Sequence, residues 1–175
     1  MKMLYAPWRS TYATSSEQSK QESAQEHECV FCQQFQKDKD KENFILKRFD
    51  NCAVMLNRYP YNAGHLLIIP YKHNGLIDDL SDDTQMEIMC LIGKCSTILR
   101  ETLKAEGVNI GINMGKAAGA GIPAHLHVHA LPRWTGDCNF LPIFGETKVI
   151  SYDLDTAYKL LKKEFDKLPS NCSTK

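Results

Sequence analysis

Residues 125–132 read HLHVHALP, with a histidine or an apolar residue alternating at each position up to Ala130. Such alternation is typical of a β-strand that turns one face to the core. It predicts that His125, His127 and His129 project from the same face, with successive histidines roughly 7 Å apart along the strand. The apolar residues between them are expected to point the other way, into a core.

A glycine-rich loop, GKAAGAGIP at residues 115–123, precedes this strand. Glycine lets backbone N–H groups approach an anion closely, so Gly115, Gly119 and Gly121 favour a phosphate site beside the imidazoles. Neutral imidazole can attack phosphorus, and neighbouring imidazoles can hydrogen-bond the phosphate oxygens. On spacing alone, two other interpretations of the histidines stay open: a solvent-facing polar edge and a metal site.

Apolar runs elsewhere in the chain predict the remaining elements. Asp50 and Asn51 tolerate turn geometry and separate two such runs, which predicts a β-hairpin. The expected strands are residues 44–49, 52–56, 65–70, 108–115 and 125–132, and the expected helices are residues 81–106 and 153–168. Because short turns join strands to strands, we expect an antiparallel sheet with helices packed on it, an α+β domain.

The longer helix carries its own start and stop signals. Asp82 and Gln85 resemble a capping box, and Gly107 is a natural C-terminal stop. Steps of three and four residues predict one buried face. That face is expected to hold Met86, Met89, Ile92, Cys95, Leu99 and Leu103.

Composition excludes several classes of protein. The chain of 175 residues fits one domain, and 21 basic residues balance 21 acidic ones, which argues against nucleic acid or an anionic membrane as a partner. No apolar run is long enough for a membrane span, and the first ten residues lack the apolar core of a signal peptide. The seven cysteines are odd in number and scattered, which indicates a reducing, cytoplasmic setting.

The stretch HLHVHALPR at residues 125–133, together with Asn113-x-Gly115 and GHLLIIP at residues 64–70, resembles the histidine triad (HIT) family of nucleotide hydrolases and transferases. The resemblance spans about residues 29–134. It implies a five-stranded antiparallel sheet with one long helix and a C-terminal helix, and a homodimer.

The flanking segments resemble one branch of that family. YAPWR at residues 5–9 and PRWTGDCNFLPI at residues 132–143 are similar to the branch that contains bacterial diadenosine tetraphosphate phosphorylases. We therefore expect an aromatic segment and mobile polar linker over residues 1–28, a HIT domain over residues 29–145 and a C-terminal helical extension over residues 146–175.

The resemblance also implies catalytic roles. His127 matches the nucleophile that becomes nucleotidylated, His129 matches the histidine that contacts phosphate and assists, and His65 matches the histidine that orients the triad. The nucleotide-binding residues that it implies are Asn57 at the ribose hydroxyls, Asn113 at the phosphate, and Gly119, Gly121 and His129 along the phosphate path.

One position departs from the family pattern. Many members carry Gly-Gln-Ser before the triad, whereas Gly121, Ile122 and Pro123 stand here, so the hydroxyl that helps the leaving group is missing. Lys116 or Arg133 is a candidate source of positive charge in its place.

Cys29-x-x-Cys32 has the spacing of a metal site but needs two more ligands, so two ordinary thiols remain the alternative. Several bacterial members of the resembled family pair this motif with the histidines at the positions of His73 and His125. The resemblance thus implies a structural Zn²⁺ on these four side chains.

The expected function is enzymatic and needs no redox cofactor. By resemblance, His127 attacks the α-phosphate of a dinucleoside polyphosphate, and orthophosphate resolves the nucleotidyl-histidine. Diadenosine tetraphosphate then gives ADP and ATP. The alternatives are a HIT-type hydrolase that releases AMP, a nucleotide-binding module with little turnover, and a metal-dependent hydrolase built on the three triad histidines.

Overall fold

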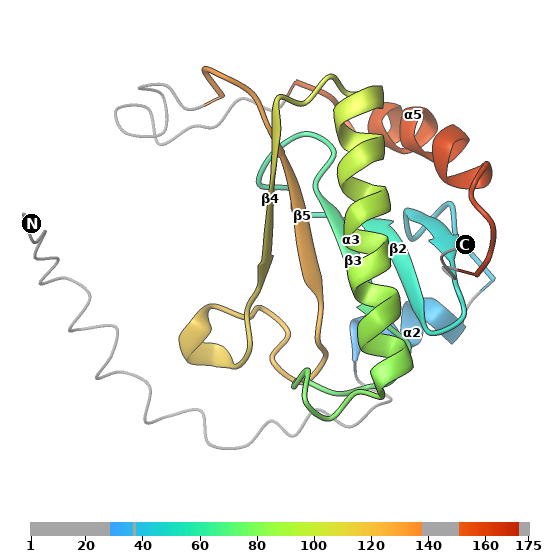
Figure 1. Cartoon of the computed structure of the whole chain (residues 1–175), viewed down its shortest axis with the longest axis vertical. Helices are drawn as coiled ribbons and strands as arrows, with labels where there is room; N and C mark the ends of the chain where they lie inside the picture. The colour runs from blue at the N-terminus through green and yellow to red at the C-terminus, as the bar shows by residue number, and fades with distance from the viewer. Residues whose placement is uncertain (1–28, 37, 138–150, 172–175) are drawn as a thin grey trace, which may run out of the picture.

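The computed structural model describes residues 29–36, 38–137 and 151–171 (Figure 1). The expected aromatic segment and linker before Cys29 and the expected domain boundary at residue 145 lie outside these residues. In chain order the elements are α2 (Val30–Gln36), β1 (Ile45–Arg48), β2 (Cys52–Leu56), β3 (Leu66–Pro70), α3 (Asp82–Thr102), β4 (Gly107–Ile112), the 3-10 helix η3 (Lys116–Ala118), β5 (Val128–Arg133) and α5 (Leu154–Asp166).

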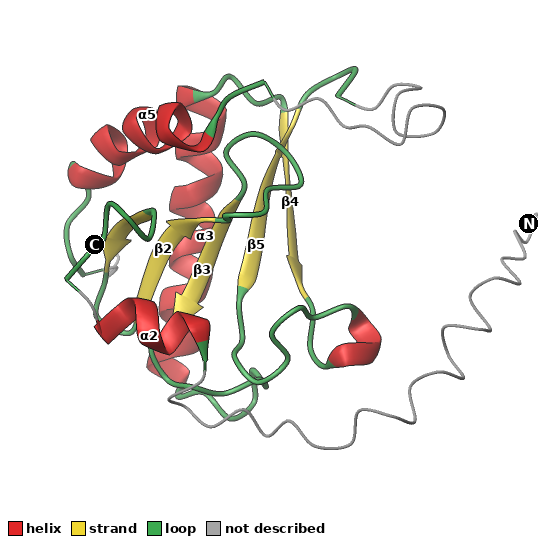
Figure 2. Ribbon diagram, turned by 180° about the vertical axis from the view of Figure 1, so that it is seen from behind, coloured by secondary structure: helices red, strands yellow, loops and turns green. Residues whose placement is uncertain are grey.

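The strands form one five-stranded antiparallel sheet in the order β1-β2-β3-β5-β4, which confirms the expected α+β class. Helices α3 and α5 cover one face, and α2 lies across the other face near β2 and β3 (Figure 2). Every residue of β2 and β3 is buried, because both faces of these central strands are covered. None of the described helices is long and apolar enough to cross a membrane.

The predicted start of α3 at Ser81 is confirmed, whereas its predicted capping residue and its predicted end were wrong. The N-cap is Ser81, whose hydroxyl accepts the backbone N–H of Thr84, one residue before the predicted capping box. The helix ends at Thr102, and Lys104 takes the left-handed conformation at φ 55° that Gly107 was expected to supply. Gly107 is instead the first residue of β4. The turn after α3 is therefore completed by Lys104, which no sequence pattern distinguishes.

The buried face of α3 also differs from the predicted one. Met86 and Met89 are 73 % and 68 % exposed, while Cys95, Leu99 and Leu103 are buried as expected. The side chains that α3 buries are Thr84, Glu87, Ile88, Leu91, Cys95, Ile98 and Leu99. A pattern that counts only apolar residues misses Glu87, and the error rotates the predicted face.

Glu87 is buried because it holds the β1–β2 turn. Its two carboxylate oxygens accept the backbone N–H of Asn51 at 3.0 and 3.2 Å, and one also accepts the side-chain amide at 3.1 Å. The thiol of Cys52 lies beside it, and burial followed by the Glu87 charge raises the pKa of that thiol far above its ordinary value. A buried carboxylate with these donors links helix and hairpin.

The last predicted strand begins later than expected. β5 starts at Val128, so His125 and His127 lie in the segment that leads into it. The backbone N–H of Leu126 in this segment donates to the carbonyl of Asn74 at 2.6 Å. A Cβ at Gly75 would collide with the carbonyl oxygen of Pro123, so only glycine permits this close approach.

Replacing the buried Glu87 with alanine should destabilise the fold by about 2–3 kcal/mol, because the half-buried Asn51 donors lose their acceptor. Urea unfolding followed by circular dichroism measures this change. The matched control is Glu101→Ala at an exposed position of the same helix, which should change stability by less than about 0.5 kcal/mol. Equal losses in the two variants would show that the Glu87 contact contributes nothing specific.

Candidate active site

The ring of His127 is oriented by the backbone of His125. Nδ1 of His127 lies 2.8 Å from the carbonyl oxygen of His125. A carbonyl only accepts hydrogen bonds, so Nδ1 must carry the proton in the neutral ring. The lone pair of His127 is therefore on Nε2, the nitrogen that a nucleophilic imidazole would use.

A second chain of hydrogen bonds fixes the protons of two other histidines. The backbone N–H of Tyr61 donates to Nδ1 of His65 at 3.1 Å. The side-chain amide of Asn57 lies 3.3 Å from the same nitrogen, and its oxygen accepts the N–H of Tyr59. Nδ1 of His65 is thus an acceptor, and Nε2 donates to Nδ1 of His129 at 2.9 Å. It follows that the proton of neutral His129 is on Nε2.

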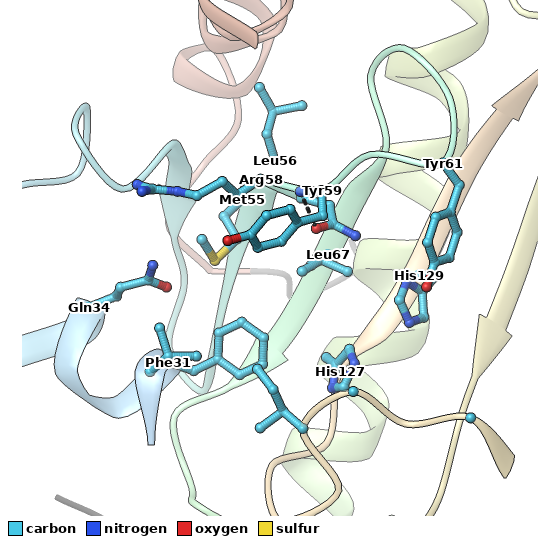
Figure 3. A pocket seen from close by; sticks show the side chains of 15 residues that line it. Phe31, Gln34, Met55, Leu56, Arg58, Tyr59, Tyr61, Leu67, His127 and His129 are labelled. Carbon is cyan, nitrogen blue, oxygen red and sulfur yellow. Dashed lines mark hydrogen bonds between the residues drawn. The ribbon is translucent and has the colours of Figure 1, made fainter. Parts of the chain in front are cut away.

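This Nε2–H group of His129 is buried and has no hydrogen-bond partner within the described structure. Burial first, and then the neighbouring His127, lowers the pKa of His129, so the ring is neutral near pH 7. The rings of His127 and His129 lie 5.0 Å apart, and the ring of Tyr61 stacks on His129 at 5.9 Å. The rings that carry the lone pair and the unsatisfied donor are therefore neighbours at one end of the pocket (Figure 3).

A pocket of about 440 Å³ contains both rings. His127 and His129 lie at one end of it, and Gln34 and Arg58 lie at the other (Figure 3). A volume of this size accommodates a small molecule. Apolar side chains form the walls between the two ends: Val30, Phe31, Met55, Leu56, Leu67 and Ile122.

The predicted nucleotide-binding residues divide into two groups. Asn57, Gly119 and Gly121 line the pocket. Asn113 does not line it, and its side-chain amide lies 3.5 Å from the carbonyl oxygen of Gly119 instead. The N–H of Gly119 donates to the carbonyl of Lys116, so this group closes a turn rather than facing an anion.

The two cations suggested for the leaving group lie elsewhere. Arg133 pairs with Asp137 at 2.7 Å, and neither Arg133 nor Lys116 lines the pocket. Arg58 does line it, although its guanidinium donates to the carbonyl of Glu42. Sequence reasoning gave Arg58 no role, because a single arginine in a loop has no distinguishing pattern.

Helix α2 was also missed, although it carries one wall of the pocket. Cys29 and Cys32 are three residues apart and Phe31 and Phe35 are four apart, which is helical spacing that could have revealed it. The ring of Phe31 lies 5.5 Å from that of His125 and 5.4 Å from that of His127. The helix is thereby packed directly on the segment that carries the histidines.

The four side chains predicted as metal ligands come together at the start of α2. One ligand atom from each of Cys29, Cys32, His73 and His125 lies within 4.8 Å of the others. Three S···N distances within the cluster are 3.3 Å for Cys29–His125, 3.4 Å for Cys32–His73 and 3.5 Å for Cys32–His125. Tetrahedral zinc with bonds of about 2.0–2.3 Å needs its ligands roughly 3.3–3.8 Å apart, so the donors fit this ion.

His125 serves this cluster and not the pocket. Its Nδ1 faces the two thiols, and its Nε2 lies 2.8 Å from the carbonyl oxygen of Pro70. Both ring nitrogens are thus engaged, which leaves none for a metal shared with His127 and His129. The three histidines have different tasks although they alternate along one segment.

Comparison with known proteins identifies the family of the chain. The model of the HIT domain family matches residues 38–136. A protein of Mycobacterium tuberculosis named AP-4-A phosphorylase is 31 % identical over 97 % of this chain and 87 % of its own length. An asymmetrical bis(5'-nucleosyl)-tetraphosphatase of Schizosaccharomyces pombe is 29 % identical over 59 % of this chain and 53 % of its own.

A solved structure shares the fold. The zinc-bound histidine triad family protein of Mycobacterium smegmatis superimposes with a TM-score of 0.66 at 27 % identity. The superposition covers 82 % of this chain and 96 % of that one. The chain therefore belongs to the HIT domain family and is an enzyme of that family.

Proposed function

We propose that this enzyme transfers a nucleotidyl group from a dinucleoside polyphosphate through a covalent nucleotidyl-histidine at His127. The observation that carries the proposal is the pair of ring nitrogens in the pocket: the lone pair on Nε2 of His127 and the unsatisfied Nε2–H of His129. One is suited to attack phosphorus and the other to donate to a phosphate oxygen.

In the first step Nε2 of His127 attacks the α-phosphorus of diadenosine tetraphosphate. A P–N bond forms, the bond to the bridging oxygen breaks, and ATP leaves. The charge that develops on the imidazole is shared through the Nδ1–H bond to the carbonyl of His125. The Nε2–H of His129 donates to a non-bridging phosphate oxygen and stabilises the charge of the transition state.

In the second step an acceptor oxygen attacks the same phosphorus and the P–N bond breaks, which restores neutral His127. Orthophosphate as acceptor gives ADP, and water gives AMP. The relative of M. tuberculosis that matches 97 % of this chain is named a phosphorylase, which favours orthophosphate. The tetraphosphatase relative matches only 59 % of the chain, so hydrolysis is the weaker alternative.

Product analysis tests the reaction. With diadenosine tetraphosphate and orthophosphate, the enzyme should release ADP and ATP in equal amounts, and His127→Ala should reduce the rate by at least about 10³-fold. Chromatography of the quenched mixtures, with and without phosphate, measures both. AMP and ATP formed regardless of phosphate would identify a hydrolase, and turnover retained in His127→Ala would disprove the nucleophile.

We also propose that Cys29, Cys32, His73 and His125 hold one structural Zn²⁺. Their spacing and chemistry support this, and four protein ligands leave no open position for catalysis. The ion would cross-link α2 to the loop after β3 and to the triad segment. The hydrogen bond from His125 Nε2 to the Pro70 carbonyl fixes the ring so that Nδ1 is the ligand.

Enzyme purified without chelator should contain about one zinc per chain. Cys32→Ser should lose most of this metal and lower the melting temperature, because thiolate is replaced by a poor ligand. Cys95→Ser, at a buried free thiol outside the cluster, is the matched control and should keep its zinc. Plasma mass spectrometry gives the stoichiometry, and a metal-free wild type would refute the site.

We further propose that the chain forms a homodimer through α3 and β4. β4 is an edge strand of the sheet, and exposed apolar side chains lie on both elements: Met86, Met89, Ile110 and the following Met114. An uncovered strand edge beside apolar side chains is suited to a partner.

The cytoplasmic location stays a prediction.

Met89→Asp should therefore raise the dissociation constant of the dimer by at least about tenfold, because it buries a charge in the interface. Sedimentation equilibrium of the wild type and the variant measures this. Lys159→Asp on the exposed side of α5 is the control for a charge change and should leave the dimer intact. A wild type that is monomeric at micromolar concentration would exclude the dimer.

A further inference from the structure

Three buried side-chain atoms lack a hydrogen-bond partner within the described structure: Gln34 Oε1, Asn43 Nδ2 and His129 Nε2. Two of these, on Gln34 and His129, belong to residues that line the same pocket. A buried polar atom without a partner is costly, and native proteins keep few of them. Two in one pocket indicate groups that a ligand completes. His129 has its role at the phosphate, whereas Gln34 has none yet.

The other polar side chains at the far end of the pocket are already engaged. Asn57 uses its amide nitrogen on His65 and its oxygen on the N–H of Tyr59. Arg58 donates to the carbonyl of Glu42, and its guanidinium lies 5.7 Å from the centre of the Phe44 ring. Arg58 can offer only further donors, whereas Oε1 of Gln34 is a buried acceptor without a partner within the described structure.

The surroundings of Gln34 suit a flat heteroaromatic ring. It lies on α2 beside Val30 and Phe31, and Met55 and Leu67 form the adjoining wall. The histidines lie at the opposite end of the pocket (Figure 3). A nucleotide with its α-phosphate at His127 would thus place its base between these apolar side chains, with the edge of the base towards Gln34.

We infer that Gln34 determines base specificity, and that its Oε1 accepts a hydrogen bond from the 6-amino group of adenine. The amide nitrogen would donate to the neighbouring ring nitrogen, because adenine presents an amino donor beside a ring acceptor and a carboxamide pairs with both. This inference rests on the proposed function, since it takes the pocket as a nucleotide site. It adds the residue that reads the base.

The amino group can be tested by itself. Purine riboside 5'-monophosphate differs from AMP only by a hydrogen in place of the 6-amino group, so binding it leaves Oε1 unsatisfied. Isothermal titration of the full chain with each nucleotide gives two dissociation constants. The wild type should bind AMP about three- to tenfold more tightly than the analogue.

Gln34→Met removes the carboxamide while it keeps the length and the helix propensity of the side chain. This variant should bind both nucleotides with a ratio near one. Its melting temperature should equal or exceed that of the wild type, because the substitution removes an unsatisfied buried oxygen. Gln36→Met, at an exposed position of the same helix, is the matched control and should keep the wild-type ratio.

The outcomes separate this inference from the function on which it rests. A Gln34→Met variant that is folded and keeps the wild-type ratio would overturn the role of Gln34, and so would a wild type that binds both nucleotides equally. A lower melting temperature of the variant without the nucleotide would assign Gln34 to the fold instead. Failure of the wild type to bind either nucleotide would overturn the proposed function as well.

Discussion

The hydrogen bond between Nε2 of His65 and Nδ1 of His129 determines what the pocket can do. It joins the start of β3 to β5, beside the register pair Leu66–Ala130. The backbone N–H of Tyr61 donates to Nδ1 of His65. The ring proton is therefore on Nε2 in neutral His65 and on Nε2 in neutral His129. Sheet pairing thereby places the N–H donor of His129 on a ring that neighbours His127.

The cluster at the start of α2 acts on the same pocket from the other side. His125 is a member of the cluster, and its carbonyl oxygen holds the Nδ1–H of His127. Phe31 on α2 packs on both rings, and Gln34 lies one helical turn after it. A change in the cluster would therefore alter both the orientation of the His127 ring and the pocket wall that α2 forms.

Sequence patterns could predict the sheet and the alternating histidines at residues 125, 127 and 129, because these depend on local alternation and spacing. They could not predict the buried face of α3, which depends on the contact of Glu87 with Asn51, 36 residues away. Nor could they distinguish His125 from His127, since the late start of β5 and the thiols of α2 separate their tasks. Gln34 is an ordinary polar residue in the sequence, and only its buried Oε1, which has no partner within the described structure, distinguishes it.

The central claim is that the fold assigns the proton of each ring before any substrate binds. Two-dimensional ¹H–¹⁵N NMR of the histidine rings measures this directly in the apo enzyme. In the neutral rings the account predicts the proton on Nδ1 of His127 and on Nε2 of both His65 and His129. A proton on Nδ1 of His129, or rings that exchange between tautomers, would contradict it.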